Sequence, residues 1–561
     1  MIHTKSRAAA AIVAGCLLAA ANTASADTGE RDGAAATAPD GQHSDASVRF
    51  DPRRAPHNGG IGENFVGLSI EWSLIERYMG PAARPVFANL LANLDTGVLR
   101  IGGSSQDQTQ FDADAPNTNR VITRQDLADI RATLDLTNGA DSAGEGPSWG
   151  VALGTATAPP SATRPWISPE HAKDFVTNGV VPEFSGDAYR YVVGVELGNE
   201  PDLTFRRNLD LYLSELAKYT DADVTAPFPV IAPNTSEPIR PWQGIASRQE
   251  PDIRFFWHWP QILDTFEGAI KAHAGPLGNY TSDHFYPLAR TCASDEYRCP
   301  TITRLLSDER LDNFGYQVFT HASEAARHGL GYRLEELNTA AGRGAPGVSD
   351  VAASAVWALD SMFNAACPQS PEDPSANRTC RVGATGVNFH NAEVRAFYFP
   401  EEGNAYYNAI RYDPTATMGS PTAAPEYYAM LFFAHLAQGT SGLRPVTVDV
   451  EAPADQVKAW RLDGARSERR LILLNKGAEP TTLTVEAPAS TYELNRMTPY
   501  DPTGAGRALD APGMQIDGNE VAADGTWPGF APTVGKITNG RLQVTLAPGE
   551  TVAISLRGLS R

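Results

Sequence analysis

Two segments of the chain place a glutamate at the point where an apolar run ends. Residues 192–202, VVGVELGNEPD, turn polar at Asn199 and Glu200, and residues 332–338, YRLEELN, turn polar at Glu336. One protonated and one ionised carboxyl can cleave a glycosidic bond, because the first protonates the leaving oxygen while the second attacks the anomeric carbon. The retaining form of this reaction needs the two carboxyls about 5–5.5 Å apart. Glu200 and Glu336 therefore predict a retaining glycosidase, provided that folding brings the two segments together.

The prediction rests on the pair, since a single glutamate at a strand end is more often a helix cap or a solvated residue. Asn199 is placed to hydrogen-bond a sugar 2-hydroxyl beside the acid, an interaction that strengthens in the transition state. Tyr286 is placed to orient the nucleophile. Glu335 is the rival of Glu336, but side-chain alternation along a strand lets only one of the two point toward a shared site.

Eight short apolar runs alternate with helix-compatible segments between residues 63 and 442. The intervening segments, such as RPVFANLLANLD and LDLYLSELAKYT, repeat apolar residues at three- and four-residue spacing. This alternation is typical of a (β/α)8 barrel, whose chemistry gathers at the C-terminal ends of its strands. The predicted strands are residues 65–72, 97–103, 149–155, 191–200, 229–235, 282–288, 332–338 and 385–391. Their ends supply Glu71, Ser104, Asn199, Glu200, Asn234, His284, Tyr286, Glu336, Asn388 and His390.

The pattern of apolar residues changes after the last helical segment. Residues 443–561 contain short alternating runs separated by Gly, Pro, Asn and Asp, which predict an antiparallel β-sandwich domain. We expect residues 46–62 to add an N-terminal strand to it. The likeliest role of this domain is structural, packing against the barrel and bracing it.

The sequences VELGNEPD and EELNTAAGRGAPGVSD resemble glycoside hydrolase family 79, which contains β-glucuronidases and heparanase. The resemblance covers nearly all of the chain after its first residues, and it implies a (β/α)8 barrel with a β-sandwich. It also implies that Glu200 is the acid/base and that Glu336, not Glu335, is the nucleophile. The expected activity is that of a secreted exo-β-glucuronidase acting on terminal β-linked glucuronic acid, 4-O-methylated or not, without a metal or organic cofactor.

The same resemblance suggests further substrate-binding residues. FVGLSIEW, LRIGGSSQD and DHFYPL resemble family segments that bind sugar hydroxyls, which implicates Glu71, Ser104, His284 and Tyr286. In the family, backbone amides of a glycine-rich loop and a tyrosine after the eighth strand hold the uronate carboxylate. In this chain the amides are those of Gly342 and Arg343 and the tyrosine is Tyr406, with Tyr407 and Tyr398 as rivals. Whether the Arg343 side chain touches substrate is left open, as are simple structural roles for His284, the glycines and the tyrosines.

Two alternatives to an exo-acting enzyme remain. One is an endo-acting, heparanase-like enzyme, which the formal net charge of −20 disfavours because a long sulfated chain needs a basic cleft. The other is a non-catalytic carbohydrate-binding protein, which has no need of both an acid and a nucleophile. The same net charge predicts no nucleic-acid partner.

Residues 1–26 predict a secretory signal peptide. Lys5 and Arg7 precede a short apolar run that ends at an Ala-Ser-Ala cleavage site, and residues 27–45 form a polar, flexible leader. Lipoprotein anchoring through Cys16 is a minority alternative, and no later run is long enough to span a membrane. The other cysteines form two local pairs that predict the disulfides Cys292–Cys299 and Cys367–Cys380, since no histidines lie at zinc-ligand spacing around them.

Overall fold

The structure is a computed structural model. It describes residues 45–49, 61–116, 121–139, 148–159, 161, 163–206, 208–236, 259–292, 297–368, 380–393, 404–412, 421–445, 448–450, 456–464, 468–504 and 508–558. The predicted signal peptide with Cys16, the leader up to residue 44, and Tyr398 lie outside these residues.

Eight parallel strands form the central sheet, and each overlaps one of the eight predicted runs. They are β2 (Val66–Glu71), β3 (Gly97–Gly102), β6 (Trp149–Thr155), β7 (Val192–Leu197), β8 (Val230–Ile231), β9 (Tyr280–Phe285), β11 (Gly331–Leu337) and β13 (Gly386–Asn391). Their order in the sheet is β8-β7-β6-β3-β2-β13-β11-β9, and nearly every residue in them is buried, as expected of a parallel sheet covered on both faces. The predicted (β/α)8 barrel is therefore confirmed.

The barrel nearly closes between β8 and β9. Thr235 and Asp283 form an isolated parallel bridge there, and the amide of His284 donates to the carbonyl of Thr235 at 2.8 Å. Strand β8 is short because Pro229 and Pro233 flank it, and a proline has no amide hydrogen to give to a ladder. This seam lies beside His284, at the end of the barrel where the chemistry is expected.

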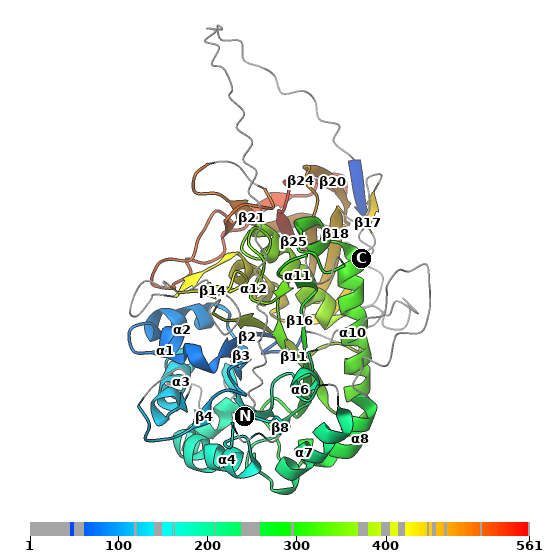
Figure 1. The fold of residues 1–561 in the computed structure, drawn as a ribbon. Coiled ribbons are helices and arrows are strands. Elements are labelled where there is room, and N and C mark those ends of the chain that lie inside the picture. The colour runs from blue at the N-terminus through cyan, green and yellow to red at the C-terminus, as the bar shows by residue number, and fades with distance from the viewer. Residues whose placement is uncertain are drawn as a thin grey trace, which may run out of the picture. The chain divides into compact units, whose positions relative to one another are not determined.

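Helices alternate with these strands (Figure 1). Helix α3 begins with a capping box in which Thr123 and Asp126 satisfy each other's amides. Helix α11 is buried over almost its whole circumference, because barrel strands cover one side and C-terminal elements the other. The helices are α1 (Ile75–Met79), α2 (Arg84–Asn93), α3 (Arg124–Asn138), α4 (Pro169–Asp174), α5 (Val181–Glu183), α6 (Pro201–Thr204), α7 (Leu209–Asp221), α8 (Trp259–Ile270), α9 (Ile302–Leu305), α10 (Asp308–Arg327), α11 (Ala352–Ala366) and α12 (Pro425–Ala437). Single tighter or wider turns occupy η1 (Trp72–Leu74), η2 (Phe175–Val180) and η3 (Gly186–Tyr191).

Three two-stranded sheets lie in the loops of the barrel. Strands β10 (Leu288–Ala289) and β12 (Ala340–Ala341) are parallel and tie the loop after β9 to the loop after β11. The others are β4 (Gln110–Phe111) with β5 (Val121–Ile122), and β14 (Ile410–Arg411) with β15 (Thr422–Ala423). The first pair matters for function, because it fixes the loops that follow His284 and Glu336.

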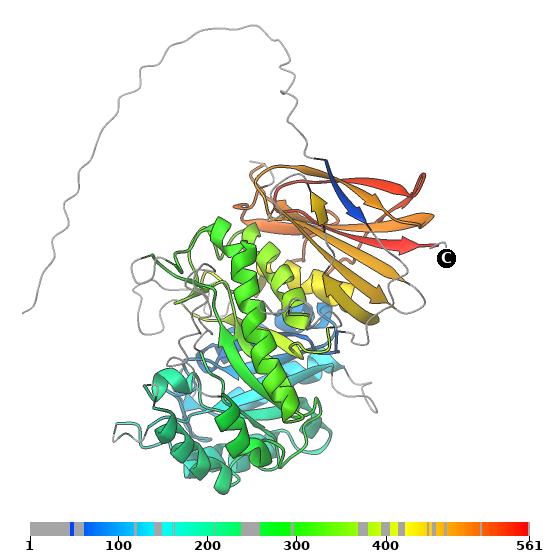
Figure 2. The ribbon, with the colours of Figure 1, turned by 90° about the vertical axis from the view of Figure 1, so that its right-hand side faces the viewer.

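Two further sheets form the C-terminal region (Figure 2). Their apolar core includes Leu471, Leu483 and Ile554. The four-stranded sheet has the order β17 (Val448–Val450), β1 (Asp45–Arg49), β20 (Thr481–Glu486) and β24 (Arg541–Leu546). The larger sheet has the order β16 (Thr440–Pro445), β18 (Val457–Gly464), β19 (Arg469–Asn475), β25 (Thr551–Arg557), β21 (Thr491–Tyr500) and β22 (Gly513–Ile516), and β23 (Thr533–Lys536) pairs with β21. The N-terminal strand β1 thus lies in a sheet otherwise made of C-terminal residues.

Buried polar contacts join the C-terminal sheets to the barrel helices. The indole of Trp460 donates to Asp360 Oδ1 at 2.7 Å, and Lys476 Nζ lies 2.5 Å from Asp308 Oδ1 and 3.4 Å from Asp360 Oδ2. The Lys476 and Asp360 side chains are fully or almost fully buried. A buried charge needs its partner, so these contacts fix the sheets against α10 and α11.

The two predicted disulfides are present. Cys292 is bonded to Cys299 and Cys367 to Cys380, with Cα–Cα distances of 4.2 and 4.7 Å. Among the helices that the structure describes, none combines the length and the apolar character needed to cross a bilayer.

Candidate active site

The C-terminal ends of five barrel strands deliver one cluster of charged and polar side chains. Glu336 comes from β11, His284 from β9, Arg100 from β3, Glu71 from β2 and His390 from β13. Glu200 follows β7 and is the first residue before α6. Parallel strands bring all their carboxyl ends to one end of the barrel, which explains why residues far apart in sequence meet here.

Glu336 is held from both sides. Its Oε1 accepts a hydrogen bond from the Tyr286 hydroxyl at 2.5 Å, and its Oε2 accepts one from Arg100 Nη1 at 2.9 Å. His284 Nδ1 and His390 Nδ1 lie 3.8 and 3.7 Å from Oε2. The carboxylate is thus fixed in direction and faces groups that favour its charge.

These neighbours decide the protonation state of Glu336. Burial by itself raises the pKa, but the charges of His390, His284 and Arg100 and the hydrogen bond from Tyr286 outweigh it and lower the pKa to about 2. Glu336 is therefore an anion at neutral pH. A carboxylate must be ionised to act as a nucleophile, and hydrogen bonds hold it in position.

Glu200 lies across His284 from Glu336. Its Oε1 is 3.2 Å from His284 Nδ1, and its side chain is 22% exposed, whereas Glu336 is almost buried. One oxygen of each carboxylate and His284 Nδ1 all lie within 4.8 Å of one another. The backbone of Glu200 is left-handed (φ 48°, ψ 57°), and its amide donates to the Asn234 carbonyl at 3.1 Å.

One ring nitrogen of His284, Nδ1, lies close to both carboxylates. Burial lowers its pKa, but Glu336 and Glu200 more than offset this, so the pKa is raised above its usual value. Its Nε2 is buried and finds no hydrogen-bond partner among the described residues. A carboxylate–imidazole–carboxylate arrangement of this size also offers three donor atoms to one divalent cation.

Asn199 is oriented by Arg100. Its Oδ1 accepts from Arg100 Nη2 at 2.7 Å, and no acceptor among the described residues takes its Nδ2. The side-chain amide therefore presents its N–H groups to a ligand, next to Glu200. Behind it, the buried carboxylate of Asp107 accepts the backbone amides of Thr157 and Asn199, and burial raises the pKa of Asp107 to about 7.

Arg100 was not identified from sequence, yet it is the most connected side chain of the site. It is fully buried and also binds Glu196, with its Nε 3.0 Å from Glu196 Oε2, and the hydroxyl of Ser69. The sequence signal was present, since an arginine in the middle of the apolar run GVLRIGG must meet buried acceptors. Its partners on other strands could not be read from that run.

Glu71 is buried in the site, and both of its carboxylate oxygens accept hydrogen bonds. Oε2 accepts from the amide of Ser105 at 2.7 Å and from its hydroxyl at 2.6 Å, and Oε1 accepts from Arg343 Nη1 at 2.9 Å. His390 Nε2 lies 3.5 Å from Oε1. Burial raises the pKa of Glu71, but Arg343, His390 and Ser105 together hold it well below its usual range.

At this position Ser105 makes the contact with Glu71, and a substrate contact of Ser104 stays a prediction. Ser104 is exposed, and its carbonyl accepts from Gln108. The glycine before them, Gly103, is left-handed (φ 71°), so the chain turns sharply and the second serine points inward. Motif resemblance located the segment but not this turn.

The loop after β12 is left-handed at three successive residues. Gly342, Arg343 and Gly344 have φ values of 79°, 74° and 76°. A Cβ atom at Gly344 would lie 2.8 Å from the amide nitrogen of Tyr407, so only glycine fits there. Gly342 is exposed, and the Arg343 side chain is buried against Glu71. No acceptor among the described residues takes the amides of Gly342 and Arg343.

Tyr406 and Tyr407 lie differently. The Tyr406 ring is half-buried under the guanidinium of Arg290, 5.0 Å away, and its amide donates to the Arg343 carbonyl. The Tyr407 ring is buried, lies 6.0 Å from both the Tyr286 and His390 rings, and its hydroxyl interacts with the Arg343 side chain. Tyr407 is thus the tyrosine closer to the two carboxylates.

Glu335 points elsewhere. It is completely buried beside Arg333, with Arg333 Nε 3.9 Å from its Oε1, and burial raises its pKa. Strand β11 shifts register against its neighbours between Leu334 and Glu336, which separates the directions of the adjacent glutamates.

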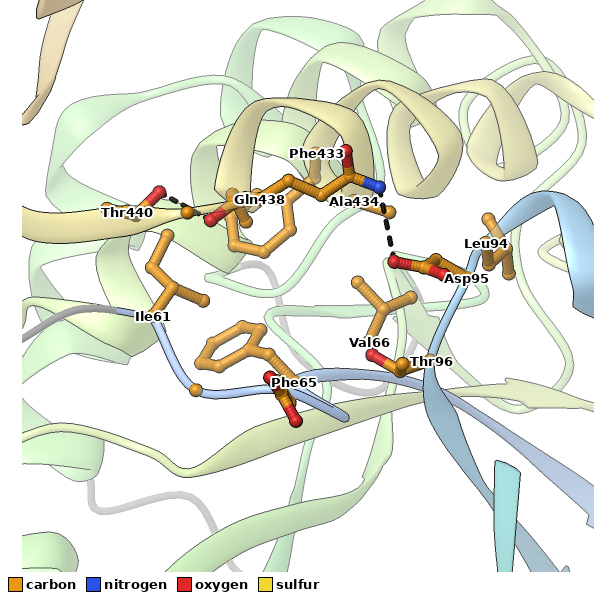
Figure 3. Close-up of a pocket in the computed structure, with 14 residues that line it drawn as sticks. Ile61, Phe65, Val66, Leu94, Asp95, Thr96, Phe433, Ala434, Gln438 and Thr440 are labelled. Atoms are coloured by element: carbon orange, nitrogen blue, oxygen red, sulfur yellow. Dashed lines mark hydrogen bonds between the residues drawn. The ribbon is translucent and has the colours of Figure 1, made fainter. Parts of the chain in front are cut away.

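A separate pocket of about 370 Å³ lies where β2 and β3 begin, at the opposite end of the barrel (Figure 3). Phe65, Val66 and Phe433 form its apolar wall, and Gln438 Nε2 donates to Asp95 Oδ2 at 3.2 Å across its edge. It shares no residue with the carboxylate cluster.

No protein-family model matches the sequence, and no curated protein matches it. Solved structures do match over almost the whole chain. A 4-O-α-L-rhamnosyl-β-D-glucuronidase from Fusarium oxysporum 12S has a TM-score of 0.60 at 15% identity, covering 91% of this chain and 100% of that chain. A family 51 α-L-arabinofuranosidase from Bifidobacterium longum has a TM-score of 0.58 at 13% identity (92% and 100%), and an α-L-arabinofuranosidase from Thermotoga maritima 0.55 at 12% (91% and 99%).

At these identities the likeness concerns the fold. The chain shares the fold of these solved glycosidases, and its two strand-end glutamates lie close together at the C-terminal end of its barrel.

Proposed function

We propose that the protein is a secreted retaining exo-β-glucuronidase. The observation that carries the proposal is the spacing of Glu200 and Glu336, whose nearest oxygens lie within 4.8 Å of each other and of His284 Nδ1. Retaining glycosidases hold their carboxyls about 5–5.5 Å apart, whereas inverting enzymes need about 6.5–9.5 Å to admit a water molecule. The spacing supports direct attack by one of the two carboxylates.

In the first step Glu200 donates its proton to the glycosidic oxygen while Glu336 attacks the anomeric carbon. The bond from that carbon to the leaving oxygen breaks, and an ester bond to Glu336 forms. The ionised state of Glu336 and the higher exposure of Glu200 support this division of roles. Asn199 then binds the sugar 2-hydroxyl through its free N–H groups.

In the second step the Glu200 carboxylate takes a proton from water, whose oxygen attacks the same carbon. The ester bond breaks and Glu336 regains its negative charge, which Tyr286 and Arg100 stabilise. The double displacement preserves the configuration at the anomeric carbon. Every step uses side chains of the cluster.

The preference for a uronic acid is supported by the glycine-rich loop. The amides of Gly342 and Arg343 have no acceptor among the described residues, and convergent amides suit an anion. Because Tyr407 lies nearer the cluster than Tyr406, we assign the tyrosine of this subsite to Tyr407. The fold shared with a rhamnosyl-glucuronidase agrees with the assignment, and the two disulfides agree with secretion.

The test compares aryl glycosides. Purified protein is assayed on p-nitrophenyl β-D-glucuronide and on the matching β-glucoside, β-xyloside, β-galactoside and α-L-arabinofuranoside, the last because two structural neighbours carry that name. We expect the highest kcat/KM on the glucuronide, with a β-configured first product by NMR. Folded protein that releases nothing from the glucuronide would refute the proposal. Internal shortening of heparan or hyaluronan fragments would favour an endo-acting enzyme, and no turnover of any substrate would favour a binding protein.

A further inference from the structure

Arg343 occupies a backbone position that disfavours it. Its φ is 74°, between two glycines that are also left-handed, and this conformation is unfavourable for a non-glycine residue because its Cβ comes too close to the following carbonyl oxygen. Glycine would remove the cost. A side chain kept at such a position is a reason to look for what it does there.

The Arg343 guanidinium meets one carboxylate. Its Nη1 lies 2.9 Å from Glu71 Oε1, and the two side chains are 9% and 2% exposed. Ser105 supplies two neutral donors to the other oxygen of Glu71. Arg343 is thus the arginine that pairs with Glu71, at a shorter distance than the His390 ring, whereas the charge of Arg100 is shared between Glu196 and Glu336.

Glu71 is close enough to the nucleophile for its charge to matter. The His390 ring bridges the two carboxylates, with Nε2 3.5 Å from Glu71 and Nδ1 3.7 Å from Glu336. Glu71 is ionised at any working pH, because its pKa is held far below the usual range despite burial. Without Arg343, only the His390 ring and the neutral donors of Ser105 would remain against Glu71, and the sugar site would carry more negative charge.

From this arrangement, and resting on the proposed function, we infer that Arg343 determines selectivity for an anionic sugar by cancelling the charge of Glu71. For an assumed separation of roughly 7 Å and an effective dielectric constant of about 20, repulsion by the Glu71 charge would disfavour a uronate carboxylate by roughly 50-fold. A neutral sugar feels no such repulsion. The arginine therefore acts through Glu71 and changes which substrate the site accepts.

Arg343→Gly is the informative variant, because glycine suits the left-handed backbone and the fold should be kept. We expect kcat/KM on p-nitrophenyl β-D-glucuronide to fall 10- to 100-fold while that on the β-glucoside changes less than 3-fold. Glu71→Gln should leave the glucuronide-to-glucoside ratio equal to or above that of the wild type. The double variant Glu71→Gln/Arg343→Gly should recover the wild-type ratio. Arg206→Gly is the matched control, since Arg206 is also left-handed (φ 50°) but exposed.

Two outcomes would overturn the inference. Equal losses on both substrates would make Arg343 a general support of the site, and a double variant that stays unselective would mean that its guanidinium binds the uronate directly. Inhibition constants for D-glucaro-1,4-lactone, which is acidic, and D-glucono-1,5-lactone, which is neutral, provide a second measure of this selectivity. They can be measured with whichever aryl glycoside the wild type hydrolyses. Failure of the proposed function appears separately, as no hydrolysis of the glucuronide by the wild type.

Discussion

Replacing Tyr286 by phenylalanine removes one hydroxyl from the proposed nucleophile. That hydroxyl donates to Glu336 Oε1 at 2.5 Å, and a hydrogen bond to a charged group contributes about 1.5–3 kcal/mol. Glu336 loses its charge when the glycosyl-enzyme forms and regains it when water releases the sugar. The hydroxyl therefore favours the second step, in which the carboxylate is the leaving group.

The expected consequence is a change of the slow step. A loss of about 1.5–3 kcal/mol of leaving-group stabilisation slows release of the sugar roughly 10- to 150-fold. The first step consumes the anion and does not gain from the hydrogen bond in the same way. The glycosyl-enzyme should then accumulate, so the Tyr286→Phe variant should release p-nitrophenol in a burst close to one equivalent, followed by a slow steady rate.

The same substitution should move the acid side of the pH profile. Burial raises the Glu336 pKa, and His390, His284, Arg100 and Tyr286 together lower it to about 2. Loss of the Tyr286 hydrogen bond raises this pKa, because the hydrogen bond favours the ionised form. The pKa of Glu336 is lower in the folded protein than in the unfolded chain, so its ionised form stabilises the fold above about pH 4.5, and this stabilisation is lost as the pH falls toward 2. Because the folded-state pKa is higher in the variant, the variant should lose less stability over this pH range.

Stopped-flow release of p-nitrophenol from p-nitrophenyl β-D-glucuronide measures the burst. Tyr332→Phe is a matched control, because the Tyr332 hydroxyl donates to the Asp283 carboxylate at the same 2.5 Å but outside the site. Both variants lose a buried tyrosine–carboxylate hydrogen bond, and only Tyr286→Phe should show the burst and the shifted acid limb. Unchanged kinetics in Tyr286→Phe, or equal effects in both variants, would refute the reasoning.

Three other perturbations have defined outcomes. Lys476→Met leaves the buried Asp360 without its cation and should lower the free energy of unfolding by about 3–5 kcal/mol in urea titrations, while unchanged stability would contradict the bracing role of the C-terminal sheets. Removing the Cys367–Cys380 disulfide with two serines should cost about 2–4 kcal/mol, measured as a lower Tm with kcat/KM unchanged at 25 °C. Zn²⁺ should inhibit competitively by bridging the two proposed catalytic carboxylates and His284, with recovery in EDTA, and equal inhibition of a His284→Ala variant would disprove that site.

Local sequence patterns were sufficient to predict the barrel. All eight strands overlap the predicted runs, although β9 begins two residues before its run and β11 begins one residue before. The signal is clearest for β3, β6 and β7, because a strand buried on both faces carries a largely apolar segment. The C-terminal strand β21 has a weaker sequence signal than the barrel strands. In β21, residues 491–500, polar side chains alternate with apolar ones and a proline is included, so the apolar signal is weak.

Side-chain direction was harder to predict than position. Ser104 and Ser105 are adjacent, as are Tyr406 and Tyr407, and in each pair the second residue contacts the site. The choice depends on left-handed turns, at Gly103 in the first pair and at the loop containing Arg343 against which Tyr407 packs in the second. A turn of this kind is set by contacts with distant segments, which a short motif does not contain.

The spacing of the two glutamates depends on a third strand. Arg100, in β3, binds Glu336 through Nη1 and the Asn199 side chain through Nη2, so one rigid guanidinium connects the segment before Glu200 to the segment carrying the nucleophile. The planar fork of an arginine fixes both distances at once, which a lysine cannot do. The two motifs that contain the glutamates therefore supply the proposed reacting groups. The distance between those groups, on which the proposal of a retaining enzyme rests, depends on an arginine about 100 residues before one motif and more than 200 before the other.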